Sequence, residues 1–138
     1  MSPPGTFEEN LSTAKGALAR YSAGPLLHLI DGELVASASG DTFGNVSPSD
    51  GKFLGEVAAG GIAEIGIAAE AAAAAFDEWS SQPPSQRKAV LNRIAELIVK
   101  RADEIAAVES VDTGQPIRFM SSAAIRGAEN FRYFADAA

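Results

Sequence analysis

Val111-Asp112-Thr113-Gly114-Gln115-Pro116-Ile117 is the stretch of this chain at which two long helical patterns meet. Gly114 follows the last periodic residue of one pattern, and Pro116 opens the next. A glycine just beyond the last helical turn and a proline at the start of the following element are typical of a helix stop and a helix start. The stretch therefore predicts a joint between two helices.

The tripeptide Asp112-Thr113-Gly114 also has a chemical interpretation. Asp-Thr-Gly is the signature of aspartic proteases, in which two such loops of an all-β fold bring a pair of carboxylates together. The single copy in this chain would require a homodimer. The residues before it, from Ile105 to Val111, are spaced as in a helix, which favours the helix stop and leaves the protease as the alternative.

Length and composition describe an ordinary globular chain. The 138 residues, of which 46% are hydrophobic and 21% charged, predict one domain with its own apolar core. The net charge of −7 disfavours nucleic acid as a partner, because no basic surface is available to bind phosphates. It equally disfavours an anionic membrane surface. We therefore expect no nucleic-acid and no membrane partner.

The sequence contains no cysteine. Disulfides, thiolate zinc sites and cysteine nucleophiles are thereby excluded for the residues of this chain. No stretch approaches the roughly 18 consecutive apolar residues of a membrane-spanning helix. The first residues lack the basic and apolar regions of a secretory signal. These features favour a cytoplasmic location.

The N-terminal region predicts one short helix. Thr6 and Glu9 have the spacing of a capping box, and apolar residues recur after them at helical intervals. The pattern predicts a helix over about residues 7–21. We interpret residues 1–25 as an N-terminal extension with a short helix, and residues 26–138 as the domain that follows.

After this helix the period changes to that of short strands. Leu27-His28-Leu29-Ile30, Asp31-Gly32 and Glu33-Leu34-Val35 form an apolar run, a turn dipeptide and a second run, which predicts a β-hairpin. Residues 43–46 and 53–57 predict two further short strands. The region is therefore expected to be antiparallel.

From Gly60-Gly61 onward the chain predicts three long helices, each with an apolar stripe spaced by three and four residues. In chain order the stripes consist of Ile62, Ile65, Ala69, Ala72, Phe76 and Trp79; of Val90, Leu91, Ile94, Leu97, Ile98, Ile105 and Val108; and of Ile117, Ala124, Ala128, Phe131 and Ala135. Pro83 and Pro84 separate the first two helices, a kink is expected near Arg101, and the third is expected to run to the last residue. The alanines allow close approach of a neighbouring backbone.

The strand, glycine turn and helix around Gly60-Gly61 have a functional alternative. Such a unit can bind a phosphate through the first amides of the helix. The dinucleotide fingerprint G-x-G-x-x-G is not completed, because Gly66 lies too late for its third glycine. The residues favour a plain helix start over nucleotide binding.

His28 is the only histidine and lies between leucines in a predicted strand. The alternation predicts that it points away from the face that the leucines bury, which favours a structural or exposed histidine over a metal ligand. Ser121-Ser122 lack the G-x-S-x-G elbow of a serine nucleophile. No complete catalytic set is therefore visible.

The last predicted helix carries three arginines, which are Arg118, Arg126 and Arg132. Arg126 precedes Glu129 by three positions, and Arg132 precedes Asp136 by four. This spacing favours weak ion pairs on a solvated face. The functional alternative is a cation directed at an anionic group of a ligand.

Six motifs, in this order, resemble the aldehyde dehydrogenase superfamily. They are His28 to Glu33, similar to the family's opening hairpin; Asn45 to Ala58, similar to its N-P-A-T-G turn and the strand after it; Ala73 to Trp79, similar to A-R-x-A-F-x-x-W; Arg87 to Leu97, similar to R-x-x-x-L-x-x-x-A-x-L-I; Glu109 to Pro116, similar to E-T-L-D-T-G-K/Q-P; and Ala128 to Ala135, similar to the helix that follows. The last motif is most similar to members that oxidise semialdehydes carrying a carboxylate. The resemblance implies an α/β fold, the N-terminal part of a cofactor-binding domain, with short antiparallel strands followed by three long helices.

The resemblance also implies an activity for a longer parent protein. Family members are NAD(P)-dependent oxidoreductases that act on an aldehyde through a thiohemiacetal, hydride transfer and thioester hydrolysis. Their cysteine nucleophile, glutamate base and Gly-rich nucleotide turn lie beyond the part matched here. We therefore expect this chain alone to hold no catalytic and no cofactor-binding residue, to bind neither NAD nor NADP, and to be inactive.

Some family roles fall on residues of this chain. The last helix lines the substrate tunnel in the family, and alignment on Arg132-Tyr133 implies that Ser122 and Arg126 lie on the tunnel side. Arg126 is then expected to recognise the carboxylate of a semialdehyde. Some members hold a structural monovalent cation near the positions that match Asn45 and Asp112. Members of the family are homo-oligomers.

The rival hypothesis is a non-catalytic helical interaction module. A family fragment is expected to leave the outer apolar stripes of its helices without partners, so that it binds ANS, self-associates or aggregates. A compact, cooperative monomer that binds no dye would instead favour the independent module.

Overall fold

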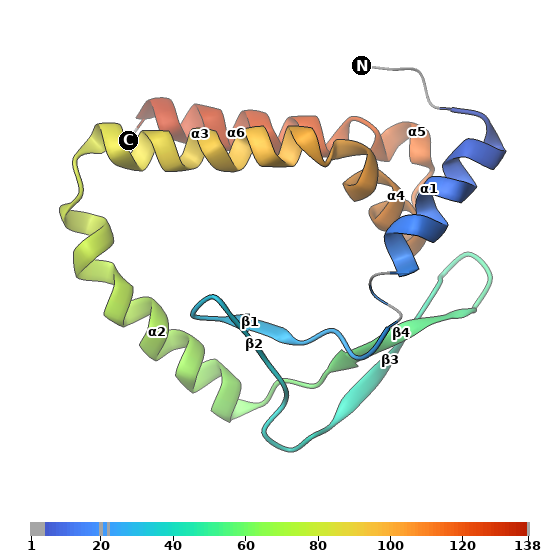
Figure 1. Ribbon diagram of the computed structural model, residues 1–138, viewed down its shortest axis with the longest axis horizontal. Helices are drawn as coiled ribbons and strands as arrows, with labels where there is room; N and C mark the ends of the chain where they lie inside the picture. Colours follow the sequence, from blue (N-terminus) through green and yellow to red (C-terminus); the bar gives the residue numbers. More distant parts are fainter. Residues whose placement is uncertain (1–4, 20, 22, 138) are drawn as a thin grey trace.

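The computed structural model of the protein describes residues 5–19, 21 and 23–137. Its elements are α1 (Phe7–Ala19), β1 (His28–Ile30), β2 (Glu33–Val35), β3 (Thr42–Val46), β4 (Phe53–Ala58), α2 (Ile62–Ser81), α3 (Pro84–Lys100), α4 (Ala102–Thr113), α5 (Ile117–Met120) and α6 (Ala123–Ala137). Short antiparallel strands followed by helices confirm the predicted α/β fold. Figure 1 shows an open ring in which α2 links the strands to α3.

The capping box at the start of α1 is confirmed. The Thr6 amide donates to Glu9 Oε2 at 2.7 Å, and the Glu9 amide donates to Thr6 Oγ1 at 3.3 Å. The helix ends at Ala19, earlier than the predicted residue 21. α1 packs against α4.

The strands form two separate antiparallel pairs, β1 with β2 and β3 with β4. Asp31 and Gly32 have φ angles of 51° and 79°, the positive values that a tight two-residue hairpin turn requires. The predicted D-G turn is therefore confirmed. Leu26 joins the two pairs, since its amide donates to the Glu56 carbonyl and its carbonyl accepts from the Ala58 amide, both at 2.8 Å.

The predicted facing of β1 is wrong. Leu29 is 72% exposed, whereas His28 and Ile30 are half-buried. The cause is the start of α2, which covers the side of β1 that carries His28. The imidazole lies so close to Gly60 that a Cβ there would stand 2.9 Å from His28 Cε1.

The second predicted helix is divided into α3 and α4, a sharper break than the expected kink. Arg101 leaves helical geometry, with φ −106° and ψ 17°. Its guanidinium holds the Glu104 carboxylate in a fork, with Nε to Oε2 and Nη2 to Oε1 both at 2.9 Å. Hydrogen bonding to Glu104 raises the pKa of Arg101. The carboxylate also lies in the first turn of α4, where negative charge is favourable.

The third predicted helix is divided as well, into α5 and α6. The hydroxyl of Ser121 donates to the Ile117 carbonyl at 2.8 Å, and that of Ser122 donates to the Phe119 carbonyl at 3.0 Å. Such short-range bonds from serine offer the backbone an alternative to the helical ladder. The break therefore falls at the two adjacent serines.

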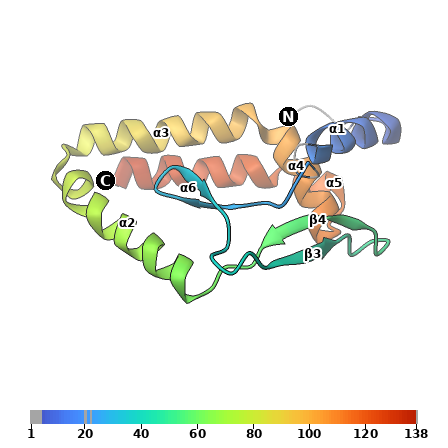
Figure 2. The ribbon, with the colours of Figure 1, turned by 60° about the horizontal axis from the view of Figure 1, so that its bottom comes forward.

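α3 and α6 lie side by side along their lengths (Figures 1 and 2). Their contact is made of small residues, because Ala95 and Ala128 are fully buried and Ala135 nearly so. Lys88 of α3 and Asp136 of α6 add an ion pair at 2.7 Å. The pairing is therefore a close alanine contact with a charged rim.

The ion pairs predicted along the last helix are wrong. Arg132 pairs with Glu129 at 2.5 Å, and Asp136 pairs with Lys88 of the neighbouring helix. Arg126 instead donates to Ser122 Oγ. Sequence spacing alone could not decide which acidic residue each arginine pairs with, because more than one lies within reach.

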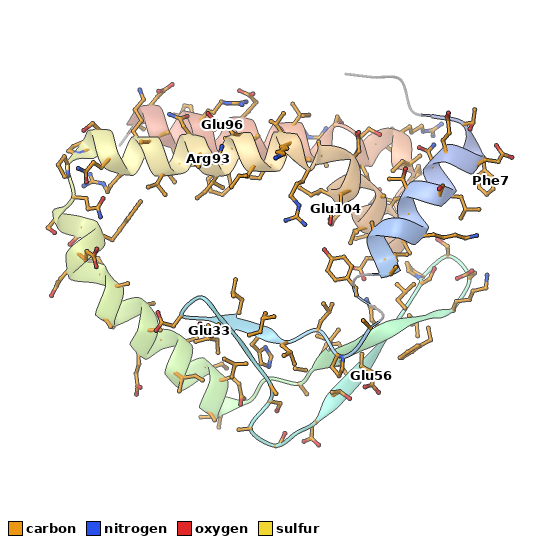
Figure 3. All side chains as sticks on the ribbon, viewed as in Figure 1. Phe7, Glu33, Glu56, Arg93, Glu96 and Glu104 are labelled. Atoms are coloured by element: carbon orange, nitrogen blue, oxygen red, sulfur yellow. The ribbon has the colours of Figure 1, made fainter. Side chains whose placement is uncertain are left out.

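The buried hydrophobic residues of the described ranges are all alanines, which are Ala58, Ala95, Ala106, Ala107, Ala124, Ala128 and Ala135. Within the same ranges, no larger side chain is fully buried. Phe7, 75% exposed, is directed away from the other elements at the outer side of α1 (Figure 3). The core described here is thus thin, and large apolar side chains lie on its surface.

Candidate functional site

The joint between α4 and α5 is a helix stop, as predicted. Gly114 is left-handed, with φ 73° and ψ 6°, and its amide donates to the Ser110 carbonyl at 3.1 Å. Thr113 Oγ1 donates to the Glu109 carbonyl at 2.6 Å, and Ser110 Oγ donates to the Gln115 carbonyl at 2.7 Å. The polar groups of the Asp-Thr-Gly stretch therefore close the end of a helix, and the structure gives no support to a protease loop.

Asp112 of this joint meets the strand region. Asn45 Nδ2 donates to Asp112 Oδ1 at 2.6 Å across 67 positions of sequence. Asn45 lies in β3, next to the register shift that separates it from Val46. The structure thus brings together the two residues predicted for a monovalent cation. The bond uses one carboxylate oxygen and turns the Asn45 nitrogen, not its oxygen, toward Asp112.

A pocket that sequence reasoning missed opens beside this pair. It has a volume of about 410 Å³, within the range of small-molecule sites. Its lining residues are Leu18, Tyr21, Leu26, Phe43, Asn45, Leu54, Gly55, Glu56, Val57, Val108 and Asp112. No sequence signal identifies it, because α1, the β3–β4 pair and α4 come together only in the fold.

The two residues predicted for the substrate tunnel are also in contact. Arg126 Nη1 donates to Ser122 Oγ at 2.6 Å, across the first turn of α6. The same hydroxyl donates to the Phe119 carbonyl at 3.0 Å, so its orientation is fixed. Arg126 is exposed, and one bond leaves most of its five N–H donors available. The arrangement thus holds an exposed guanidinium beside Ser122.

The start of α2 is already occupied by a carboxylate of the chain. Glu64 Oε2 accepts from the Gly61 amide at 2.6 Å, and Oε1 accepts from the Ala38 amide at 2.7 Å. Glu64 is buried, and hydrogen bonds from Gly61 first and then Ala38 lower its pKa. An incoming phosphate would meet a negative charge on these amides. The turn therefore does not fit a dinucleotide phosphate.

His28 lies against this same turn. Its Nε2 is buried and has no hydrogen-bond partner among the described residues. In residues 5–19, 21 and 23–137, no group of three or more His, Cys, Asp or Glu side chains has the arrangement of a metal site. His28 lies within electrostatic reach of the Glu64 carboxylate.

Comparison with known proteins identifies the family. The profile described as "Aldehyde dehydrogenase family" matches residues 34–138. The chain belongs to the aldehyde dehydrogenase family. The predicted resemblance is thereby confirmed.

Individual aldehyde dehydrogenases agree with this assignment. The chain is 42% identical over 111 residues to 2-hydroxymuconic semialdehyde dehydrogenase of Pseudomonas sp. (strain CF600), which covers 79% of this chain and 23% of that protein. Among solved structures, HpcC from Thermus thermophilus matches with a TM-score of 0.88 and 43% identity, over 91% of this chain and 24% of HpcC. PnpE in complex with nicotinamide adenine dinucleotide matches with a TM-score of 0.76 and 36% identity, over 82% of this chain and 23% of PnpE.

The chain thus spans about a quarter of the length of these proteins. None of the helices in the described part of the chain is long and apolar enough to cross a membrane.

Proposed function

We propose that this chain is the N-terminal segment of an NAD(P)-dependent aldehyde dehydrogenase that oxidises a semialdehyde carrying a carboxylate to the corresponding acid. Membership of the family and the similarity to a protein named for a semialdehyde support the reaction class. The observation that carries the substrate class is the exposed Arg126 guanidinium, held by Ser122 Oγ at 2.6 Å. The complete protein is proposed to act as a cytoplasmic homo-oligomer.

The role of Arg126 follows from its geometry. A guanidinium can bind a carboxylate through two parallel N–H···O bonds, which fix both the position and the direction of the bound group. The bond to Ser122 removes part of the side chain's rotational freedom before the ligand arrives, so less entropy is lost on binding. Arg126 would thus orient a carboxylated aldehyde at its charged end, and other residues would act on the aldehyde.

The chain by itself is proposed to be inactive and to bind no NAD(P). It contains no cysteine, and its one strand–glycine–helix turn is filled by Glu64. We further propose that residues 1–25 are an N-terminal extension, whose helix α1 packs against α4, and that residues 26–138 are an incomplete N-terminal domain of the enzyme.

Substitution of Arg126 in the full-length protein tests the substrate class. Hydrogen bonds to a charged group contribute about 1.5–3 kcal/mol each, so Arg126→Ala is expected to lower kcat/KM for a carboxylated aldehyde roughly 10- to 100-fold, mainly through KM. A neutral aldehyde of similar length should be unaffected. Arg118→Ala is the matched control, because Arg118 lies over the Phe119 ring at 4.7 Å on the preceding turn. Equal losses for both aldehydes would contradict the proposal.

We also propose that Asn45 and Asp112 contribute to a structural monovalent cation site in the full-length protein. The pair offers the second Asp112 oxygen, and a cation would need further oxygens from elsewhere in the protein. Thermal unfolding in potassium chloride and in tetramethylammonium chloride at equal ionic strength checks this. The full-length protein should be more stable in potassium, and Asp112→Asn should remove the difference.

A further inference from the structure

Aspartate precedes glycine at two positions of this chain, in Asp31-Gly32 and in Asp50-Gly51. In such a pair the backbone nitrogen of the glycine can attack the side-chain carboxyl carbon of the aspartate, because glycine has no Cβ to hinder the approach. The new C–N bond closes a succinimide ring, and the carboxyl hydroxyl leaves with the amide proton as water. Addition of water to one or the other ring carbonyl then gives aspartate or isoaspartate. Because the reaction is intramolecular, the position and freedom of the two groups set its rate.

The structure restrains both reacting groups of Asp50-Gly51. The Gly51 amide donates to the Ser47 carbonyl at 2.8 Å, so the attacking nitrogen is already bonded. The Asp50 carboxylate accepts from the Lys52 amide at 3.2 Å and pairs with Lys52 Nζ at 2.7 Å. Hydrogen bonding to Lys52 lowers the pKa of Asp50, which disfavours the protonated carboxyl that can lose water. This pair is therefore protected from ring closure.

Asp31-Gly32 lacks these restraints. It forms the turn that joins β1 to β2, next to Glu33 (Figure 3). Both residues are exposed, and a Cβ added at Gly32 would meet nothing within 4 Å. Among the described residues, no hydrogen bond or ion pair holds the Asp31 side chain, and no turn or loop bond uses the Gly32 amide. The two groups are therefore free to approach one another.

Isomerisation of this pair would alter the β1–β2 hairpin. Its turn joins Ile30 to Glu33, and the two central residues have φ angles of 51° and 79°, the positive values that a two-residue hairpin turn requires. Isoaspartate routes the main chain through the former side chain and so adds a methylene group to the backbone. The turn cannot keep its geometry with this longer link, and the pairing of Ile30 with Glu33 is lost.

We propose that Asp31-Gly32 is a site of isoaspartate formation, and that the α-carboxylate freed there is a methyl acceptor for an S-adenosylmethionine-dependent isoaspartate methyltransferase. The methyl group passes from the sulfonium sulfur to a carboxylate oxygen, and the sulfur leaves as a neutral thioether. Attack of the backbone nitrogen on the ester closes the succinimide again and releases methanol. Hydrolysis of that ring restores a fraction of the aspartate in each cycle. The hairpin turn is thus a point at which the chain ages and is repaired.

Prolonged incubation of the 138-residue chain at neutral pH tests this. Cleavage after Glu33 places the two pairs on different peptides, and electron-transfer fragmentation distinguishes isoaspartate from aspartate in each. Purified isoaspartate methyltransferase with labelled S-adenosylmethionine measures the methyl acceptors. Isoaspartate at Asp31 is expected to exceed that at Asp50 by about tenfold or more, since one hydrogen bond to a charged group changes a rate by that factor.

Three controls separate the fold from the dipeptide chemistry. In concentrated urea, where the contacts of the fold are lost, the two pairs should react at similar rates. Lys52→Ala removes the ion pair of Asp50 and should raise isoaspartate there, while Asp31 is unchanged. Asp31→Asn keeps the turn, because asparagine tolerates positive φ, and should form isoaspartate faster with loss of ammonia through the same ring.

Equal isoaspartate at the two pairs in native buffer would overturn the proposal, as would isoaspartate confined to Asp50. The absence of isoaspartate at Asp31 in native buffer, while urea produces it at both pairs, would do the same. An aged chain that contains isoaspartate at Asp31 and takes up no methyl label would overturn the assignment of the methyl acceptor.

Discussion

Replacement of Gly114 by alanine is the most direct test of the helix joint. A residue with a Cβ costs about 1–2 kcal/mol in the left-handed conformation, and Gly114 has φ 73°. The added Cβ would also stand 3.0 Å from Pro48 Cγ in the β3–β4 turn. Overpacking of this kind costs about 1 kcal/mol or more. Gly114→Ala is therefore expected to lower the free energy of unfolding by about 2–3 kcal/mol in total.

Substitution of a second glycine separates the backbone cost from the cost of the contact with Pro48. Gly32 has φ +79°, and a Cβ added there meets nothing within 4 Å. Gly32→Ala should therefore show only the backbone cost of about 1–2 kcal/mol. Pro48→Ala in the Gly114→Ala background should recover the contact portion, because it removes the atom that the new Cβ meets.

Urea unfolding followed by far-UV circular dichroism measures these differences through the transition midpoint and slope. Equal losses for Gly114→Ala and Gly32→Ala would refute the contact with Pro48. No loss for Gly114→Ala would refute the left-handed helix stop itself. Gly114→Asn should be milder than Gly114→Ala in backbone strain, since asparagine tolerates this conformation better.

Two further substitutions test the α2 start and the alanine contact. Hydrogen bonds from Gly61 and Ala38 lower the pKa of Glu64 from its ordinary value of 4.5. The ionised Glu64 therefore stabilises the fold fully above pH 4.5, and this stabilisation is lost as the pH falls through the lower pKa of the folded state. Glu64→Gln should weaken the fold at neutral pH and flatten the acid limb of a circular-dichroism pH titration, and an unchanged acid limb would contradict this. Ala128→Leu, at a fully buried site between α3 and α6, should cost about 1–3 kcal/mol by overpacking, whereas the exposed Ala137→Leu should be neutral in the same urea assay.

Local chemistry made part of this fold predictable. The Thr6–Glu9 cap, the Asp31-Gly32 turn and the Gly114 stop each depend on residues within a few positions of one another, and all three are present. Two of the family motifs contain such joints, the Asp31-Gly32 turn and the Gly114 stop. Short-range rules suffice where one residue type satisfies one backbone geometry.

The rest depended on contacts that the sequence does not encode locally. The facing of His28 is decided by α2, which covers that side of β1. The partner of Asp136 is Lys88, on a helix that lies beside α6 only in the fold. The break at Ser121-Ser122 was missed because helical spacing continues through it, while the hydroxyls bond back to carbonyls.

The features of the candidate site also differ in whether the sequence could predict them. Asn45 and Asp112, and likewise Ser122 and Arg126, were named through resemblance to a family, and the structure places the members of each pair 2.6 Å apart. Proximity of Asn45 to Asp112 could not follow from spacing, since 67 positions separate them. The 410 Å³ pocket beside them had no sequence signal of any kind.

The described residues bury only small apolar side chains, and the large ones of α2 are exposed. Burial of a large aliphatic or aromatic side chain contributes roughly 1.5–3 kcal/mol, and the described residues bury only alanines among their hydrophobics. The exposed side chains of Ile62, Ile65 and Phe76 therefore contribute little to the free energy of folding. Joints fixed by local chemistry give the chain its shape, and burial of large apolar side chains adds little to its stability.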